Sequence, residues 1–485
     1  MKLREAIEKM AGRSPHLDPA LAESDVTRFV IDSREADAGS VFFALSQPEY
    51  KNNGFNGDFT DSTEYVPAAL AAGAAAAVVR DDRFKEHFGA LDGEKQRLIF
   101  SDDVIASLQA LAHQVYLEWD RPVVAITGSA GKTTAKELTA HVLSSAGLRV
   151  LRNKKNYNNG LGHPLTVLEL AGDASYQMAV LEMGMSTPLN EIQRLCRITP
   201  PDVSVVLNVL PVHIEHLGTI ERIRQAKAEI VEGMKDGGTA VLNVDDHRVA
   251  SMADLSKGHV VTFGIENEAD VRAKGIEFTG FGKTRFRLVT PAGEAAVAFP
   301  LNGKHNVMNA LAAAAVGHIY GMGPADIAGA FATVTAPGQR GEIVEYKAGF
   351  RVINDSYNSN PDALVSMAET LVAGSRPDER KIVVAGEMLE LGEAAVEMHQ
   401  EAGRRIGNLG VDLLIGVRGL AEHIVMGAKA EGISEAVFAA DSDTAGEMLA
   451  GLVRSGDVIL VKGSRGVKTE RVLEKLDDKI GRAHV

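Results

Sequence analysis

The segment best suited to chemistry is a loop with two glycines, a lysine and two threonines, at 128–134 (GSAGKTT). An apolar, β-branched run precedes this loop, and apolar residues at helical spacing follow it. A strand, loop and helix in this order can turn backbone N–H groups toward a polyphosphate at the positive end of the helix. The lysine can reach the outer phosphates, and the first threonine can offer its hydroxyl to Mg²⁺. The predicted ATP-binding loop consists of Gly128, Ser129, Ala130, Gly131, Lys132, Thr133 and Thr134.

One spacing in this loop differs from the common phosphate-loop pattern. Ile126 stands five residues before Gly131, where a glycine is usual. The alternative is an ordinary glycine turn between a strand and a helix. A similar segment at 280–284 (GFGKT) lies between stretches of alternating apolar residues and has no helix after it. We expect a hairpin turn at that second segment, and we assign the phosphate site to the first.

Two polar side chains end the apolar runs that we expect beside the phosphate loop. Glu182 follows 178–181, and Asn208 lies near the end of 203–209 with His213 just beyond. Ligands collect beyond the carboxyl ends of parallel strands, and a bound Mg²⁺ offsets the cost of burying a carboxylate. We therefore predict that Glu182 binds Mg²⁺, with the capping of a neighbouring helix as the alternative. A histidine considered alone is more often structural.

Lys227 lies in the middle of an apolar stripe on the helix expected at 219–234. A buried lysine favours its neutral amine, which can be chemically modified. Carbamylation by CO₂ would turn it into an anionic oxygen ligand, able to join Glu182 and His213 on a second Mg²⁺. The alternative is a lysine that snorkels to solvent or forms a salt bridge.

Other polar segments contain candidate binding residues. Asn158 and Asn159 could orient a substrate, or could simply form a turn. His305 and Asn306 open an alanine-rich helix and suit contact with a nucleotide base, although asparagine is also a common helix cap. Arg34, in a polar turn, could meet a phosphate or a carboxylate, or could pair with a nearby acid.

The composition excludes several classes of function. A formal charge of −14 over 485 residues disfavours nonspecific binding to nucleic acid or to an anionic membrane surface. The single cysteine, Cys196, excludes an intrachain disulfide framework. The first residues lack the apolar core of a signal peptide, and the longest apolar runs are too short to span a bilayer. We therefore expect a cytoplasmic protein without membrane insertion.

The elements that must position these residues predict an α/β protein of three domains. Residues 1–101 form a small mixed α/β domain, with strands expected at 26–31 and 40–45 and a long surface loop at 46–65. Residues 102–336 form a central P-loop mononucleotide-binding domain with a mostly parallel sheet. Residues 337–485 form a Rossmann-like domain, because apolar runs there alternate with helical stretches and end in glycine.

In this order the motifs resemble the Mur ligases, which are ATP-dependent amide-forming enzymes of peptidoglycan synthesis. The resemblance covers essentially the whole chain. The motif at 355–361 (DSYNSNP) and the double-asparagine loop look most like the branch that joins D-alanyl-D-alanine to a UDP-MurNAc-tripeptide. The segments that carry the resemblance are 32–34, 156–164, 180–184, 208–218, 303–309, 355–361, 386–392 and 462–465.

The resemblance implies that the first domain binds the UDP-sugar-peptide, the second ATP and the third the incoming dipeptide. It implies two Mg²⁺ ions, one on Thr133 and Glu182 and another on Glu182, His213 and carbamylated Lys227. It makes Lys132, Glu182, His213 and Lys227 the catalytic residues. The ATP contacts that it implies beyond the loop are His305, Asn306, Asn309, Arg340 and Asp355. The substrate contacts that we predict are Ser33, Arg34, Asn158, Asn159, Tyr357 and Asn358.

One segment departs from the family pattern. The family usually has a short Asp-Gly-His-x-Phe loop after the second strand, whereas 46–65 is longer and lacks that histidine. Competing functions are a ligase that adds a single amino acid, a kinase or nucleotide switch, and a noncatalytic nucleotide-binding protein. A GTPase would need an Asn-Lys-x-Asp motif to bind guanine, but the similar segment at 153–156 lacks the aspartate. We expect a monomer.

Overall fold

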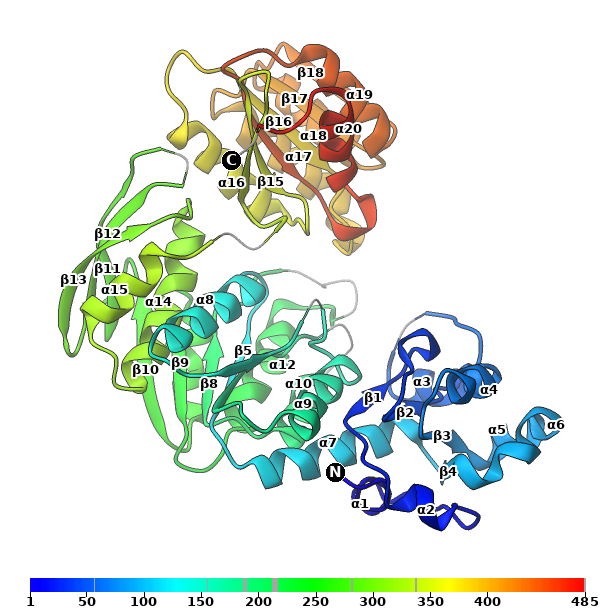
Figure 1. The fold of residues 1–485 in the computed structure, drawn as a ribbon. Helices are drawn as coiled ribbons and strands as arrows, with labels where there is room; N and C mark the ends of the chain where they lie inside the picture. The colour runs from blue at the N-terminus through cyan, green and yellow to red at the C-terminus, as the bar shows by residue number, and fades with distance from the viewer. Residues whose placement is uncertain are drawn as a thin grey trace.

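The computed structural model describes residues 1–55, 57–154, 156–185, 190–211, 217–280, 282–335 and 338–483. Each of three parts of the chain has its own sheet, and helices pack against these sheets (Figure 1). The predicted three-domain α/β fold is therefore confirmed. The predicted boundaries stay predictions, and the second one falls on residues 336 and 337, outside the described part.

The N-terminal domain has a four-stranded parallel sheet in the order β1-β2-β3-β4. Both strands expected there are present. The strands are β1 (Arg28–Val30), β2 (Ser40–Phe43), β3 (Ala76–Arg80) and β4 (Leu98–Ser101). The helices are α1 (Leu3–Lys9), α2 (Pro19–Ala22), α3 (Gln47–Asn52), α4 (Val66–Ala71), α5 (Asp81–Glu86) and α6 (Phe88–Leu91), with 3₁₀ turns η1 (Ser33–Glu35), η2 (Ser62–Tyr65) and η3 (Asp92–Arg97).

The prediction of a long surface loop at 46–65 was wrong, because α3 and η2 lie within it. The Glu49 carboxylate accepts the backbone N–H of Ser46 at 2.8 Å, which closes the first turn of α3. Its other oxygen accepts the N–H of Val104 at 3.0 Å. The Tyr50 ring packs against Phe55, with 4.9 Å between ring centroids. These contacts, some of them with residues distant in the sequence, therefore give the described residues of the polar segment 46–65 a defined structure.

The central domain has one sheet in the order β13-β12-β11-β10-β9-β8-β5-β7-β6. Its parallel part runs from β11 to β6, whereas β11, β12 and β13 are antiparallel, so the mostly parallel sheet is confirmed. The strands are β5 (Val123–Thr127), β6 (Val150–Arg152), β7 (Met178–Glu182), β8 (Val203–Val206), β9 (Thr239–Asn243), β10 (His259–Gly264), β11 (Val271–Phe278), β12 (Thr284–Thr290) and β13 (Gly293–Phe299). The turn between β11 and β12 is the predicted hairpin.

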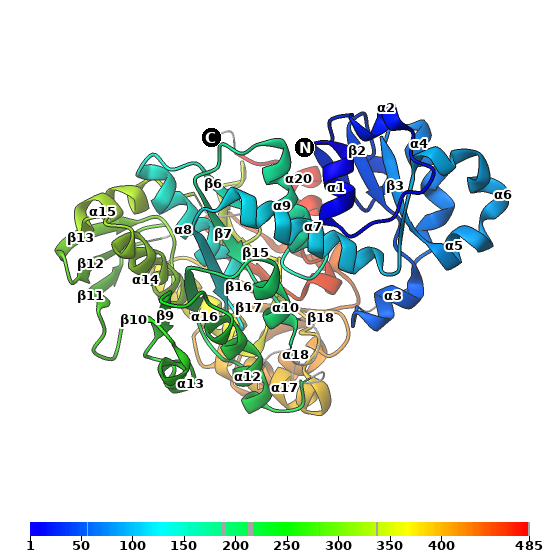
Figure 2. The same ribbon diagram turned by 90° about the horizontal axis from the view of Figure 1, so that it is seen from below.

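Helices cover both faces of this central sheet (Figure 2). Helix α7 packs against both α1 and α9, so it joins the first two domains in one hydrophobic core. The helices are α7 (Val104–Trp119), α8 (Lys132–Ser145), α9 (Gly162–Gly172), α10 (Glu191–Ile198), α12 (Ile220–Glu232), α13 (His247–Ala250), α14 (Lys304–Ile319) and α15 (Pro324–Ala332), with the 3₁₀ turn η4 (Ser251–Leu255).

The C-terminal domain has a sheet in the order β14-β15-β19-β16-β17-β18, parallel except for β14. The strands are β14 (Glu342–Glu345), β15 (Arg351–Asp355), β16 (Lys381–Gly386), β17 (Leu413–Val417), β18 (Glu435–Ala439) and β19 (Val458–Lys462). The helices are α16 (Pro361–Gly374), α17 (Ala395–Gly407), α18 (Ala421–Ala430), α19 (Ser442–Leu452) and α20 (Glu470–Lys479), with 3₁₀ turns η5 (Gly392–Ala394) and η6 (Arg465–Val467). This is the predicted Rossmann-like arrangement.

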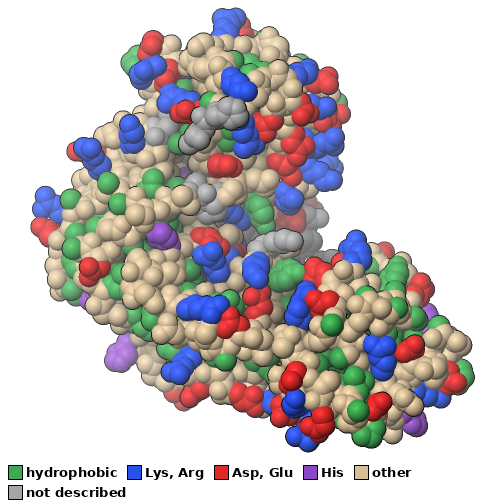
Figure 3. Space-filling view, viewed as in Figure 1, with side chains coloured by type: hydrophobic (Ala, Val, Ile, Leu, Met, Phe, Trp, Pro, Cys, Tyr) green, Lys and Arg blue, Asp and Glu red, His purple; other side chains and the backbone are tan. Residues whose placement is uncertain are grey.

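The surface is hollowed between the N-terminal and C-terminal domains (Figure 3). Lysine and arginine side chains lie near this hollow, among acidic ones. Within the described residues, no helix has the length and apolar character needed to cross a membrane.

Candidate active site

The predicted phosphate loop connects β5 to α8. All five residues of β5 are buried, and α8 begins at Lys132. Gly131 has a φ of +82°, which is a left-handed conformation that favours glycine. A Cβ atom on Gly131 would lie 2.4 Å from Oδ1 of Asn309, so the loop packs directly on the start of α14. Both the turn and its close packing therefore require glycine here.

Asn208 fixes the loop from the neighbouring strand. Its backbone carbonyl accepts the N–H of Ser129 at 3.0 Å, and its Oδ1 accepts the N–H of Ala130 at 2.9 Å. The sequence placed Asn208 at the end of a strand but did not indicate this contact, because the order of the strands was unknown. The two bonds hold the backbone of the loop in place.

Glu182 ends β7 next to this loop, because it pairs in register with Ile126 of β5. It is 4% exposed. The hydroxyl of Thr133 donates to Oε2 of Glu182 at 2.7 Å, and Nδ2 of Asn158 donates to Oε1 at 2.7 Å. In the described part of the chain this carboxylate caps no helix. Its two oxygens instead face the side chains of two predicted site residues.

The amine of Lys132 folds back onto its own loop. It donates to the carbonyl oxygens of Gly128 at 2.8 Å and Ser129 at 3.3 Å. Burial lowers the pKa of Lys132, the negative charge of Glu182 opposes this change, and the positive charge of Arg340 adds to it. Charged groups from β7 and from the linker thus act on the same lysine.

Lys227 is buried in α12, as its place in the apolar stripe predicted, and is 2% exposed. Burial lowers its pKa well below the usual value, and the positive charge of Lys132 lowers it further. No hydrogen-bond acceptor contacts its amine within the described residues. His213 lies outside that part, and the described residues hold no cluster of three or more His, Cys, Asp or Glu side chains suited to a metal.

A cavity of about 530 Å³ lies between the central and C-terminal domains. It brings together most of the predicted site residues. From the central domain these are Ser129, Ala130, Gly131, Lys132, Thr133, Thr134, Asn158, Glu182, His305, Asn306 and Asn309; from the C-terminal part they are Arg340, Asp355, Tyr357 and Asn358. Lys462, which the sequence also offered as a candidate, lines it too. Lining residues that the sequence predictions did not assign to the site include Lys304, Met308, Ser366 and Met367.

Asp355 and Lys462 form an ion pair of 2.5 Å on the C-terminal side of this cavity. The two residues are register partners at the carboxyl ends of the parallel strands β15 and β19. The amine of Lys462 also donates to the carbonyl of Asn358 at 2.9 Å. The sequence could not indicate this pair, because β15 and β19 lie 107 residues apart at that point. The pair fixes the carboxylate of a predicted ATP contact.

His305 contacts the C-terminal domain from the start of α14. Its Nδ1 lies 3.4 Å from the hydroxyl of Ser366 in α16. Burial lowers the pKa of His305 to about 4, so the ring is neutral near neutral pH. Asn306 donates to the carbonyl of Asn302 at 2.7 Å, which is a local contact of the helix start.

Three predicted substrate contacts lie outside the cavity lining. The side chain of Arg34 is largely exposed and pairs with Asp32 at 2.6 Å, while Ser33 is in the same turn. Asn159 accepts the backbone N–H of Gly162 at 2.9 Å, so it forms the turn that the sequence offered as the alternative. Burial raises the pKa of Tyr157 in the central domain, and the negative charges of Glu35 and Asp32 raise it further.

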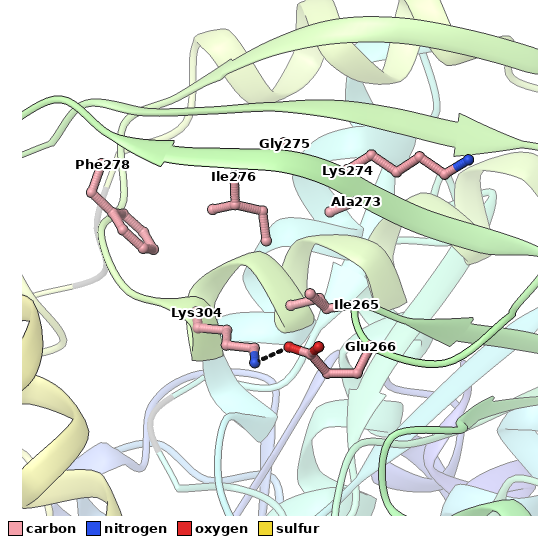
Figure 4. A pocket seen from close by; sticks show the side chains of 8 residues that line it. All are labelled: Ile265, Glu266, Ala273, Lys274, Gly275, Ile276, Phe278 and Lys304. Atoms are coloured by element: carbon pink, nitrogen blue, oxygen red, sulfur yellow. Dashed lines mark hydrogen bonds and ion pairs between the residues drawn. The ribbon is translucent and has the colours of Figure 1, made fainter.

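A second cavity, of about 430 Å³, lies under β11 beside the start of α14 (Figure 4). Ile276 and Phe278 point into it, and its ion pair joins Lys304 to Glu266. None of the predicted site residues lines it, so we assign the chemistry to the larger cavity.

The chain is similar to known proteins over most of its length. The family model of the Mur ligase middle domain matches residues 126–317, and that of the Mur ligase glutamate ligase domain matches residues 339–465. A UDP-N-acetylmuramoyl-tripeptide–D-alanyl-D-alanine ligase of Haemophilus influenzae is 31% identical over 94% of each chain.

Solved structures of similar chains give the same result. MurF of Acinetobacter baumannii is 27% identical, with a TM-score of 0.85 over 99% of each chain. MurF of Thermotoga maritima in complex with ADP is 28% identical, with a TM-score of 0.78 over 96% of this chain and 99% of that chain. The chain therefore belongs to the Mur ligase family, on the branch of the UDP-N-acetylmuramoyl-tripeptide–D-alanyl-D-alanine ligases.

Proposed function

We propose that this chain uses ATP to join D-alanyl-D-alanine to UDP-MurNAc-tripeptide, through an acyl phosphate, with release of ADP and phosphate. The observation that carries the proposal is the cavity itself. Its central-domain wall presents the phosphate loop with Lys132 and Glu182, and its C-terminal wall presents Arg340 and the Asp355–Lys462 pair. A nucleotide bound on one wall therefore meets charged groups from the other, as a reaction joining two substrates requires.

In the first step, a carboxylate oxygen of the tripeptide attacks the γ-phosphorus of ATP. The bond from that phosphorus to the bridging oxygen of ADP breaks, and an acyl phosphate forms. A bound triphosphate would replace the two loop carbonyls that Lys132 now contacts, so the lysine and Arg340 stabilise the negative charge on the transferring phosphoryl group.

In the second step, the amine of D-alanyl-D-alanine attacks the carbonyl carbon of the acyl phosphate. The amine loses a proton, and the carbon–oxygen bond to phosphate breaks, which leaves the new amide. The walls that the two domains give this cavity would limit the access of water, which would otherwise hydrolyse the acyl phosphate.

The residues present fit a Mg²⁺ ion beside the loop. The Thr133 hydroxyl and the Glu182 carboxylate are hard oxygen donors held 2.7 Å apart. The ion would offset phosphate charge there. A second ion, on Glu182, His213 and carbamylated Lys227, remains part of the proposal. It is supported by a buried Lys227 amine whose lowered pKa favours the neutral form that reacts with CO₂.

Phosphate release tests the reaction. Purified protein, ATP and UDP-MurNAc-tripeptide are combined with D-alanyl-D-alanine or with single amino acids. The proposal expects phosphate release that depends on both the tripeptide and the dipeptide. Release with a single amino acid would indicate the alternative ligase, whereas release without any acceptor would indicate a nucleotide hydrolase.

The proposed substrates also suggest the cellular compartment of the protein and its binding partners. ATP and UDP-linked precursors are intracellular metabolites, so we propose a cytoplasmic enzyme whose partners are its small-molecule substrates. Ser33, Arg34, Asn158 and Asn159 remain proposed contacts of the UDP-sugar-peptide. We retain the monomer as a proposal, which sedimentation of the purified protein would test.

A further inference from the structure

The ring of Tyr357 lies close to two guanidinium groups. The Cζ atom of Arg340 lies 4.0 Å from the ring centroid, and that of Arg465 lies 5.8 Å from it. Both distances are within the range of about 6 Å in which a cation and an aromatic face attract each other. One tyrosine therefore contacts an arginine of the linker and an arginine that follows β19.

The loop that carries Arg340 is also bonded to the backbone of Tyr357. The N–H of Tyr357 donates to the carbonyl of Gln339 at 3.2 Å. Gln339 and Gly341, on either side of Arg340, have φ values of +62° and +80°. Non-glycine residues seldom adopt this left-handed conformation, so the contacts around the loop must hold it. Ring and backbone of Tyr357 together set the direction of Arg340.

Arg465 lies where a small charged acceptor could reach it. Its side chain is 59% exposed and pairs with Glu470 at 2.7 Å. Leu389, a large apolar residue that is 38% exposed, is close by, because its N–H donates to the hydroxyl of Ser464 at 3.0 Å. A cation beside exposed apolar surface suits a small peptide with a carboxylate and methyl groups.

We propose that Tyr357 is a positioning residue that directs Arg340 to the transferring phosphoryl group and Arg465 to the carboxylate of the incoming dipeptide. This inference rests on the proposed function. It assigns the role to the ring, because the described residues give the Tyr357 hydroxyl no hydrogen-bond partner. A guanidinium that is already stacked loses less freedom when its ligand binds, so the ring contributes to both steps.

Replacement of the ring tests the proposal. In Tyr357→Leu, kcat falls and the KM for D-alanyl-D-alanine rises, each about 3- to 30-fold, which corresponds to the loss of one cation–aromatic contact. The KM for UDP-MurNAc-tripeptide stays near the wild-type value. Tyr357→Phe, which keeps the ring, recovers most of what Tyr357→Leu loses. A Phe variant as impaired as the Leu variant would overturn the role of the ring.

Double-mutant cycles separate positioning from a general loss of structure. In an Arg340→Ala background, Tyr357→Leu should cause no further fall in kcat. In an Arg465→Ala background, it should cause no further rise in the KM for the dipeptide. Fully additive effects in both cycles would overturn the proposal. Thermal unfolding checks that each variant folds, and Tyr357→Met replaces the Leu variant if that one does not.

Failure of the proposed function is recognised separately. If the wild-type protein releases no phosphate with the dipeptide, the proposal of a ligase reaction is itself wrong. If the wild-type protein is active and the cycles are additive, only the role of Tyr357 is wrong.

Discussion

Thr133 and Glu182 lie 49 residues apart in the sequence, yet a 2.7 Å hydrogen bond joins the threonine hydroxyl to the glutamate carboxylate. The bond connects the first turn of α8 to the end of β7, which is the strand beside β5. The other carboxylate oxygen accepts the amide of Asn158, so donors from α8 and from the loop before α9 hold it. A nearly buried carboxylate fixed in this way is prepared to bind a cation, because little reorganisation is needed.

The substitution Glu182→Gln removes the negative charge of the carboxylate but keeps nearly the same side-chain shape. We expect the Mg²⁺ concentration for half-maximal activity to rise about tenfold or more, since a contact with a charged group contributes about 1.5–3 kcal/mol. The measurement is the initial rate of phosphate release as a function of MgCl₂. Glu169→Gln is the matched control, because Glu169 pairs with Lys154 away from the cavity. An unchanged Mg²⁺ dependence in Glu182→Gln would contradict the assignment.

Lys132→Ala removes the lysine of the phosphate loop. We expect a loss of about 10- to 150-fold in kcat, which corresponds to about 1.5–3 kcal/mol for a charge-assisted contact made mainly in the transition state. The chain offers a matched control in Lys283→Ala. Lys283 follows a similar glycine pair, but it is exposed in the turn between β11 and β12. Full turnover by Lys132→Ala would show that the phosphate-loop role is wrong.

The strand, turn and helix around the predicted phosphate loop could be predicted because their signal is local. Glycine, lysine and threonine at fixed spacing between a strand and a helix indicate the backbone turn and suggest its chemistry. The burial of Lys227 was also predictable, since the 3.6-residue period alone places it on the apolar face. In both cases all the residues that carry the signal lie within one or two neighbouring elements.

The contacts that the sequence did not indicate depend on strand order. The Asp355–Lys462 pair forms because β19 lies next to β15, although three strands separate them in the chain. Asn208 bonds the loop because β8 lies next to β5. The error at 46–65 has the same origin, since Glu49 is held by Val104, 55 residues away. Periodicity carries no information about such neighbours.

Lys227→Ala tests the proposed carbamate. We expect a large loss of ligase activity, because the carbamate would supply an anionic oxygen that alanine lacks. Formate or acetate should restore part of the activity by placing a carboxylate in the space that the side chain leaves. The measurement is phosphate release with increasing carboxylate concentration.

A nearby lysine provides the control for this rescue. Lys235 follows α12 and pairs with Asp202 at 3.0 Å, so Lys235→Ala opens no buried site for a carboxylate. Short carboxylates should leave the activity of that variant as it is. Full activity of Lys227→Ala without any added carboxylate would refute the carbamate.

We expect the stability of the protein to depend on pH through His163. The ring is fully buried in α9, its Nε2 lies 2.7 Å from the hydroxyl of Thr199, and within the described residues its Nδ1 has no partner. Burial lowers the pKa of His163 from 6.5 to about 3. As the pH falls below about 6.5, the unfolded chain therefore binds a proton that the folded protein does not bind until about pH 3. We therefore expect the contribution of this ring to the free energy of unfolding to decrease over that range.

We expect His163→Gln to remove this part of the pH dependence, because glutamine does not titrate. The free energy of unfolding of the wild type minus that of the variant should fall by up to about 1.4 kcal/mol for each pH unit below about 6.5. Urea unfolding of both proteins between about pH 7.5 and about pH 5 measures this difference, in which the titration of shared carboxylates cancels. His259→Gln, at an exposed position, is the matched control. A difference between wild type and His163→Gln that stays constant with pH would mean that the ring accepts its proton equally well in the folded protein.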